Sequence, residues 1–156
     1  MISIEAEPFT SPDGVVMSER YAEELTRRFD SGYDPTRGLP ATDEDLGPPW
    51  GLFLIARLDA VPVGCGGFKR MAPDTAEVKH LWVAPEHRGL GVARRLLEAL
   101  KDAAVRAGYR RMVLDTSRYL TEAVALYHRS GYVEIAPYNQ NEYAHHWFEK
   151  PLTADG

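Results

Sequence analysis

The sequence has a single cysteine, Cys65, among its 156 residues, so no disulfide can form within the chain. A protein without disulfides suits a reducing compartment, and we expect a cytoplasmic location. No uninterrupted apolar run approaches the roughly 18 residues of a membrane span. The first residues also lack the basic flank and apolar run of a secretory signal. We therefore expect no membrane partner.

Basic residues are fewer than acidic ones, with 18 Lys and Arg against 23 Asp and Glu, which gives a formal net charge of −5. Proteins that bind nucleic acid gain much of their affinity by neutralising phosphates with basic side chains. The acidic balance therefore argues against a nucleic-acid partner. Hydrophobic residues make up 44% of the chain, close to the globular average, and the length suits one domain over residues 1–156.

Changes of hydrophobic period predict an α+β domain with a mixed central sheet. Strand-like runs occupy residues 2–8, 51–71 with a turn at Asp59 and Ala60, 76–83, 110–116, 132–135 and 143–150. Helix-like apolar stripes follow residues 18–29, 93–107 and 120–127, and Gly108 stands where a left-handed residue would end the second helix. The strand–helix–strand order from 76 to 116 requires parallel pairing of its two strands.

Residues 31–50 show no periodicity and are rich in glycine and proline. Long loops in small domains are often lids or disordered segments, so we expect a flexible loop or lid here. Asp43, Glu44 and Asp45 would attract a cationic substrate if this loop covered a cleft. The alternative is an acidic loop that is simply solvated.

The turn from Arg88 to Ala93, with the sequence RGLGVA, lies between a predicted strand and a predicted helix. Its glycines leave room for a bound phosphate, and the first N–H groups of a helix have no intrahelical partners. The helix dipole and the nearby arginines also favour an anion. The turn lacks the Gly-Lys-Ser/Thr ending of a Walker loop and the third glycine of the dinucleotide fingerprint. A helix that merely begins with glycines, with solvated arginines beside it, is the alternative.

Four segments in order resemble the GNAT acyltransferase superfamily, namely AEVKHLWVAP at 76–85, RGLGVA at 88–93, LDT at 114–116 and EAVALYHRSGYVEIAPYN at 122–139. The chain is similar in particular to a bacterial subgroup whose substrates are largely unassigned. The resemblance covers nearly the whole chain. It implies a GNAT-like mixed sheet of about six or seven strands flanked by about four helices, in a single acetyltransferase domain. Homodimers are common among relatives, so a homodimer and a monomer are both left open.

The resemblance further implies acetyl-CoA as co-substrate, bound in an opening between the strands at 76–83 and 110–116. The pyrophosphate would lie on the glycine turn, and the pantetheine would pair with the strand at 76–83. The residues assigned to the cofactor are Leu81, Trp82, Val83, Arg88, Gly89, Leu90, Gly91, Val92, Ala93, Arg94 and Thr116. Leu120 replaces an asparagine that often contacts the cofactor in this family, and Thr116 or Ser117 is expected to substitute for it.

The reaction implied is direct attack of an amine on the thioester, without a metal. A lysine-like amine with a pKa of about 10.4 is protonated at neutral pH, so a base must remove a proton. Glu77 matches the position of a catalytic glutamate in several members, acting directly or through water. The alternative is that Glu77 only pairs with Lys79 or Arg70. Tyr127 matches the tyrosine that faces the CoA sulfur, with an aromatic core role as the alternative.

The substrate is the least defined part of the sequence. His80, Tyr138 and Asn139 are candidates to contact the acceptor, although sheet packing explains His80 equally well. Cys65 lies in a glycine-rich strand, where a buried cysteine is expected rather than a nucleophile. The sequence therefore predicts an acetyl-CoA-dependent N-acetyltransferase acting on a primary amine of a small molecule or peptide. The alternatives are a protein N-terminal or lysine acetyltransferase and a non-catalytic acyl-CoA-binding regulatory module.

Overall fold

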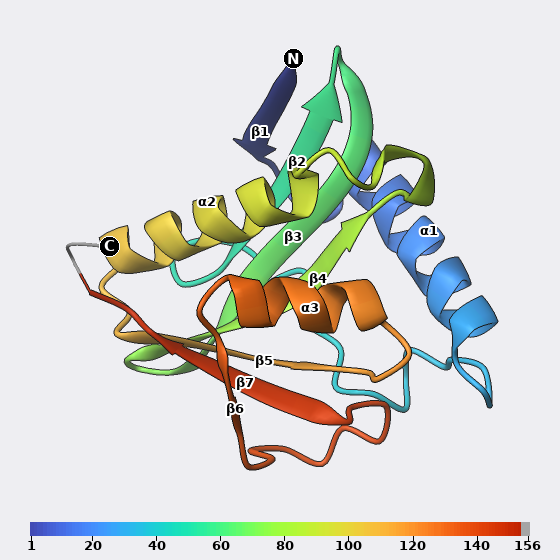
Figure 1. The fold of residues 1–156 in the computed structure, drawn as a ribbon. Helices are drawn as coiled ribbons and strands as arrows, with labels where there is room; N and C mark the ends of the chain where they lie inside the picture. The colour runs from blue at the N-terminus through green and yellow to red at the C-terminus, as the bar shows by residue number, and fades with distance from the viewer. Residues whose placement is uncertain (154–156) are drawn as a thin grey trace.

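A seven-stranded sheet forms the centre of the computed structural model, which describes residues 1–153 (Figure 1). In sheet order its strands are β1 (Ile2–Ala6), β2 (Leu52–Leu58), β3 (Val61–Ala72), β4 (Thr75–Val83), β5 (Arg111–Thr116), β7 (His146–Pro151) and β6 (Val133–Ile135). The helices of the described chain are α1 (Pro12–Arg28), α2 (Val92–Arg106), α3 (Thr121–Arg129) and a 3-10 turn at Pro85–His87. The predicted α+β fold with a mixed sheet is confirmed.

The pairing of β4 with β5 is the one parallel contact among the strands that the structure describes, and it is short. Only residues 75–77 of β4 pair with residues 111–113 of β5, whereas β5 continues its antiparallel pairing with β7 as far as Thr116. The remainder of β4, from Val78 to Val83, pairs with β3 alone. The two strands therefore diverge and leave an opening at their carboxyl ends, as the sequence predicts.

A β-bulge in β4 accounts for this divergence. Cys65 of β3 lies opposite Trp82 and Gly67 lies opposite Lys79, so β4 contains one more residue than β3 between these two pairs. His80 lies in this bulge with a left-handed φ of 57°. A bulge bends its strand and increases its twist, which turns the end of β4 away from β5.

Alternating side chains of the central strands build a core on each face of the sheet. Leu54 and Ala56 of β2 pack in the cluster that contains Leu96, Leu97 and Leu100 of α2. Phe53 and Ile55, on the other face, pack in the cluster that contains Met17 of α1. Helices α1 and α2 therefore cover opposite faces, and α3 lies beside α2 in front of the sheet (Figure 1).

The helix boundaries follow from local capping. The start of α1 at Pro12 is earlier than the predicted stripe at 18–29, because Ser11 accepts a hydrogen bond from Gly14 N and proline suits the first helical turn. Helix α2 ends just before Gly108, whose φ of 94° confirms the predicted left-handed residue. Within residues 1–153 none of the helices is both long and apolar enough to cross a membrane.

Residues 31–50 contain no helix or strand, and they pack against the α1 side of the sheet. Ala41 and Leu46 are buried in the same core cluster as Met17. The Lys79 ammonium donates a hydrogen bond to the carbonyl oxygen of Leu39 at 3.0 Å. The loop thus forms part of the wall of a cavity described below, while its predicted flexibility stays a prediction.

Candidate active site

Two cavities occupy the opening between β4 and β5, and they share a wall. The first, which we call the helix-end cavity, measures about 410 Å³ and lies between the end of β4, the start of α2 and the helix α3. The second, which we call the aromatic cavity, measures about 120 Å³ and lies between α1, the 31–50 loop and the end of β5. The residues that line both are Tyr21, Leu81, Leu120, Ala123 and Tyr127. A molecule in one cavity therefore meets a molecule in the other at this shared wall.

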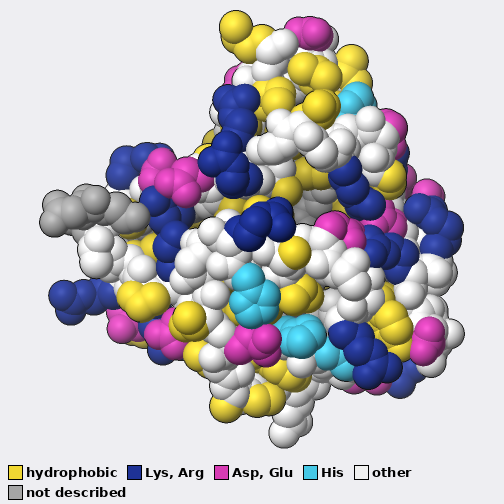
Figure 2. Space-filling model, in the orientation of Figure 1, with side chains coloured by type: hydrophobic (Ala, Val, Ile, Leu, Met, Phe, Trp, Pro, Cys, Tyr) yellow, Lys and Arg dark blue, Asp and Glu magenta, His cyan; other side chains and the backbone are white. Residues whose placement is uncertain are grey.

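The helix-end cavity is apolar at its floor and basic at its rim. Leu81, Trp82 and Val83 line it from β4, and Arg88, Gly89, Gly91, Val92, Ala93, Arg94 and Arg129 add to the wall. Figure 2 shows basic side chains beside a hollow between α2 and α3. Most of the residues predicted for the cofactor are therefore brought together. Leu90 is not among them; it is 56% exposed and does not line the cavity.

The glycine turn leaves backbone donors free for an anion. Gly89 and Gly91 have φ angles of 85° and 77°, and Gly91 begins α2 without a side-chain cap. A Cβ atom built on either glycine would find no protein atom within 4 Å. Their glycine character is thus explained by backbone conformation and by open space in front of the turn. The first N–H groups of α2 face this space without intrahelical partners, which fits the pyrophosphate of a CoA molecule.

The guanidinium of Arg88 is paired within the protein, whereas the sequence predicts that it faces a bound anion. Its guanidinium donates to both carboxylate oxygens of Glu24, at 2.7 and 2.8 Å, and to the carbonyl of Val83 at 3.0 Å. Glu24 lies on α1 with only 3% of its surface exposed. Burial alone would raise the pKa of Glu24, but hydrogen bonds from Arg88, Trp82 and Arg28 lower it below its usual value. Arg88 therefore braces the turn. Of the arginines predicted for the cofactor, Arg94 also lines the helix-end cavity.

Tyr127 lies at the shared wall, where the sequence predicts a catalytic tyrosine. Its side chain is 5% exposed, and its ring packs against Tyr132 and Phe148 at centroid distances of 5.8 and 5.7 Å. The position of Tyr127 therefore fits both the catalytic interpretation and the interpretation as an aromatic core residue. Burial, together with the nearby charge of Asp115, raises the pKa of Tyr127. The phenol stays protonated at neutral pH, which is the state that an acid needs.

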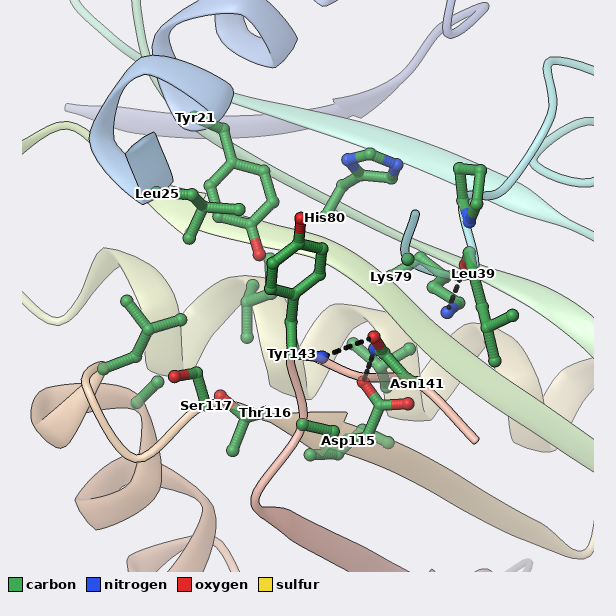
Figure 3. A pocket seen from close by; sticks show the side chains of 18 of the residues that line it. Tyr21, Leu25, Leu39, Lys79, His80, Asp115, Thr116, Ser117, Asn141 and Tyr143 are labelled. Carbon is green, nitrogen blue, oxygen red and sulfur yellow. Dashed lines mark hydrogen bonds between the residues drawn. The ribbon is translucent and has the colours of Figure 1, made fainter. Parts of the chain in front are cut away.

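The aromatic cavity is lined by rings and closed at its base by polar groups (Figure 3). Phe29, Tyr33 and Tyr143 contact one another on one side, and Tyr21 projects from α1 toward them. Asp115 lies at the base, where Asn139 and Asn141 donate hydrogen bonds to its two oxygens at 2.7 and 3.1 Å. Thr116 and Ser117 follow Asp115 along the wall, so the predicted cofactor residue Thr116 lies in the aromatic cavity.

Glu77 lies outside the walls of both cavities. Its carboxylate is 4% exposed, accepts a hydrogen bond from the Tyr138 hydroxyl at 2.6 Å and lies 3.5 Å from the Lys79 ammonium. The pairing with Lys79, which the sequence leaves open as an alternative, is thus observed. Glu77 reaches the aromatic cavity only through Lys79, which does line it.

Two of the residues predicted for the acceptor are placed elsewhere. The Tyr138 hydroxyl donates a hydrogen bond to Glu77. The side-chain amide of Asn139 donates to Asp115 and accepts from the Trp147 indole. Neither lines the aromatic cavity, and the polar groups of both side chains are engaged by these partners. Their places in the wall are taken by Asn141 and Tyr143, a few residues further along.

His80 does line the aromatic cavity, as predicted for an acceptor residue. Its ring packs against Phe9 and Tyr21 at centroid distances of 5.1 and 5.9 Å, and its buried Nδ1 has no hydrogen-bond partner in the described structure. Burial, with a smaller contribution from Lys79, lowers the pKa of His80 to about 4. His80 is therefore a neutral imidazole at physiological pH.

Cys65 is buried in β3, and burial raises the pKa of its thiol to about 12. It lines neither cavity, which agrees with the expected buried strand cysteine. Over residues 1–153, His, Cys, Asp and Glu side chains form no group of three that could hold a metal ion.

Sequence reasoning missed Asp115, Asn141, Tyr143 and the α1 residues Tyr21 and Glu24. Asp115 belongs to the LDT segment at the end of β5, so its position beside the opening could have drawn attention to it. Tyr21 and Glu24 lie within the predicted helix at 18–29, on a stripe that continues from Met17 at helical spacing and could have drawn attention to them. Asn141 and Tyr143 lie in the loop before β7, which begins at His146 and not at 143 as the sequence predicts.

A mixed sheet that splays beside a glycine-rich helix start, with a second cavity meeting it at a buried tyrosine, is the arrangement of a CoA-dependent acyltransferase. Residues 18–132 match the model of the acetyltransferase (GNAT) family, and the chain belongs to this family of acetyl-CoA-dependent acetyltransferases. An IAA acetyltransferase of Azospirillum brasilense is 35% identical over 120 residues, which cover 74% of this chain and 76% of that protein.

Solved structures show the same fold. An acetyltransferase of the GNAT family from Staphylococcus aureus is similar with a TM-score of 0.83 and 18% identity, over 98% of this chain and 100% of that one. A further similar structure, from Salmonella typhimurium, is described as an acetyltransferase with its cofactor acetyl-CoA. It has a TM-score of 0.70 and 20% identity, over 98% of this chain and 95% of that one. The GNAT-like fold predicted from the sequence is thereby confirmed.

Proposed function

We propose that this acetyltransferase transfers the acetyl group of acetyl-CoA directly to a primary amine of a small molecule. The helix-end cavity would hold the CoA part of the donor, and the aromatic cavity would hold the acceptor. The observation that carries this proposal is the shared wall, where Tyr127 lines both cavities. Two reactants placed on either side of that wall would meet without a covalent enzyme intermediate.

Binding of the donor would use the groups already described. The diphosphate would receive hydrogen bonds from the amides at the start of α2, with Arg94 and Arg129 at the rim of the same cavity. The pantetheine would lie along the part of β4 that β5 does not pair, residues 78–83. Arg88 already occupies the carbonyl of Val83, so we expect the backbone at Leu81 to be the main pairing site.

The acceptor enters as an ammonium ion and must lose a proton before it attacks. Asp115 is the only carboxylate in the described wall of the aromatic cavity, and we propose that it accepts this proton directly or through water. The amine nitrogen then forms a bond to the carbonyl carbon of the thioester. Glu77 is a positioning residue in this scheme, because it holds Lys79 and Tyr138.

Collapse of the tetrahedral intermediate breaks the bond between carbon and sulfur. The electron pair of that bond leaves with the sulfur as CoA thiolate, and Tyr127 would supply the proton that converts it to the thiol. The nitrogen releases its second proton to solvent, and the proton held by Asp115 replaces the one that Tyr127 gave. One acetyl-CoA and one ammonium ion therefore give one amide, one CoA thiol and one proton, with the protein unchanged. Main-chain N–H groups near Val83 are the expected donors to the carbonyl oxygen in the transition state.

The experiment that tests this function is release of CoA thiol from acetyl-CoA in the presence of amines, with the acetylated product identified by mass spectrometry. We expect turnover that depends on a small primary amine. A cavity of only about 120 Å³ favours a small acceptor over a protein chain, so peptides bearing a free N-terminus or a lysine should react more slowly. Tight binding of acetyl-CoA without release of thiol by any amine would contradict the proposal and support a non-catalytic acyl-CoA-binding module.

A further inference from the structure

The walls of the aromatic cavity carry information about the acceptor that the family does not supply. Three rings form a continuous surface, with centroid distances of 5.8 Å between Phe29 and Tyr33, 5.5 Å between Phe29 and Tyr143 and 5.0 Å between Tyr33 and Tyr143. Leu25, Leu39 and Leu114 extend the apolar surface. Such a wall favours a flat apolar group, which gains from burial and from edge and face contacts with rings.

The one cationic side chain in the described wall of the aromatic cavity is already paired, whereas its one carboxylate is not paired with a cation. Lys79 is the only lysine or arginine in its described wall, and it is already engaged by the Leu39 carbonyl at 3.0 Å and the Glu77 carboxylate at 3.5 Å. His80 adds no positive charge, because burial keeps its pKa at about 4. A carboxylate on the acceptor would therefore find no free cation to balance it, and its desolvation would be uncompensated.

Asp115 presents the opposite situation. It accepts two hydrogen bonds, from the amides of Asn139 and Asn141, whereas an ionised carboxylate has about four acceptor positions. The two amides are neutral, so the negative charge of Asp115 is not cancelled by a partner. The remaining acceptor positions suit an ammonium group, and the electron-rich faces of the neighbouring tyrosines add attraction for a cation.

We infer that the acceptor is a small primary amine with an aromatic body and no carboxylate. This inference rests on the proposed function and names the substrate class of that site. The ring of the acceptor lies against Phe29, Tyr33 and Tyr143, and its ammonium group lies at Asp115. The nitrogen is then close to the wall shared with the helix-end cavity, where the ammonium loses one proton to Asp115 and the nitrogen takes the acetyl group from sulfur.

The test measures the rate at which the unmodified protein releases CoA thiol with each of four acceptors. The acceptors are 2-phenylethylamine, L-phenylalanine, L-phenylalanine amide and propylamine. We expect kcat/KM for 2-phenylethylamine to exceed that for L-phenylalanine by about 100-fold, since an unpaired buried charge costs several kcal/mol. L-Phenylalanine amide has nearly the same bulk without the charge, so it should be acetylated faster than the acid. Propylamine should be at least about 10-fold poorer than 2-phenylethylamine, because it lacks the buried ring.

A pair of variants tests the ammonium site. Asp115→Asn should raise KM for 2-phenylethylamine by about 10-fold or more while the Kd of acetyl-CoA stays within about twofold. The matched control is Asp43→Asn, the same change at an exposed position of the 31–50 loop that lines neither cavity. It should behave like the unmodified protein.

Equal or better use of L-phenylalanine or propylamine would overturn the inference while leaving amine acetylation standing. An unchanged KM in a folded Asp115→Asn protein would overturn the ammonium site. Failure of every amine to release thiol, with acetyl-CoA still bound, would instead remove the proposed function and this inference with it.

Discussion

The guanidinium of Arg88 holds both carboxylate oxygens of Glu24, at 2.7 and 2.8 Å, although the two residues are 64 positions apart. Glu24 also accepts a hydrogen bond from the Trp82 indole at 2.9 Å, and Arg28 joins Glu24 to Glu122 of α3. One buried carboxylate thus links α1, the end of β4, the glycine turn and α3. These are the elements that surround the helix-end cavity, so we regard Glu24 as a positioning residue for the CoA site.

The first prediction concerns Glu24→Gln. This change keeps the size of the side chain but removes the negative charge that Arg88 and Arg28 face. Breaking a buried ion pair from one side costs about 3 kcal/mol, so the thermal unfolding temperature should fall clearly. The Kd for acetyl-CoA should also rise, because the turn before α2 loses its brace. Differential scanning and calorimetric titration measure the two effects.

Glu23→Gln is the matched control for that prediction, because Glu23 is the exposed neighbour of Glu24 on the same helix. It should leave both quantities unchanged. Because its hydrogen bonds outweigh burial and lower its pKa, Glu24 stabilises the fold above its ordinary pKa, and this contribution is lost as the pH falls through the lowered value. The stability difference between the variant and the unmodified protein should therefore shrink in acid. A constant difference from pH 7 to pH 3 would contradict this assignment.

A second prediction uses two glycines at opposite ends of α2. Gly91 and Gly108 both have positive φ, at 77° and 94°, and a Cβ atom on either would meet no protein atom within 4 Å. Replacing either glycine by alanine should lower the free energy of unfolding by about 1 kcal/mol through backbone strain alone. Only Gly91→Ala should also weaken acetyl-CoA binding, by about 10-fold or more, because its methyl group would stand where we place the diphosphate. Equal Kd values for the two variants would show that the turn does not bind this group.

Tyr127→Phe is the third prediction. Loss of the hydroxyl should lower kcat by about 10- to 100-fold through loss of the proton supplied to the thiolate, with little change in the Kd of acetyl-CoA. Tyr132→Phe is its control, because the Tyr132 ring is buried against Tyr127 and its hydroxyl donates to the Met112 sulfur away from both cavities. If the two variants lost activity equally, the role of Tyr127 would be packing.

A fourth prediction separates the two carboxylates that compete for the role of base. Asp115→Asn should lower kcat/KM by about 100-fold. Glu77→Gln should reduce kcat/KM less, because Glu77 acts on the site only through Lys79, which lines the aromatic cavity. A larger loss of kcat/KM in Glu77→Gln than in Asp115→Asn would restore Glu77 as the base that the sequence suggests.

The glycine turn and the opening beside it could be predicted from the sequence because they depend on local backbone and chain order. The glycines at 89 and 91 mark a helix start, and the parallel pairing of β4 with β5 follows from chain order. The resemblance adds the position of Tyr127, which the structure places at the shared wall. None of these features requires knowledge of distant contacts.

The acceptor half could not be predicted for the opposite reason. Whether Glu77 faces a cavity depends on Tyr138, which lies 61 positions away and takes its carboxylate. The charge of Arg88 is likewise neutralised by Glu24, which lies 64 positions earlier in the chain, so this pairing has no local sequence signal. The bulge at His80 also has no signal in the sequence, because any residue other than glycine is uncommon at positive φ.

The last prediction concerns His80 and acid stability. Its pKa is about 4 in the fold, against an ordinary value of 6.5, because the ring is buried. Between these two values the unfolded chain binds a proton at this position and the folded chain does not, so stability falls as the pH drops from 6.5 to about 4, by the order of 2 kcal/mol. His80→Asn should remove this loss, since asparagine does not titrate and tolerates the left-handed φ of 57°. Urea unfolding at several pH values measures it, with His128→Asn as the control at an exposed histidine of α3. A pH dependence in His80→Asn as steep as in the unmodified protein would show that the acid sensitivity arises elsewhere.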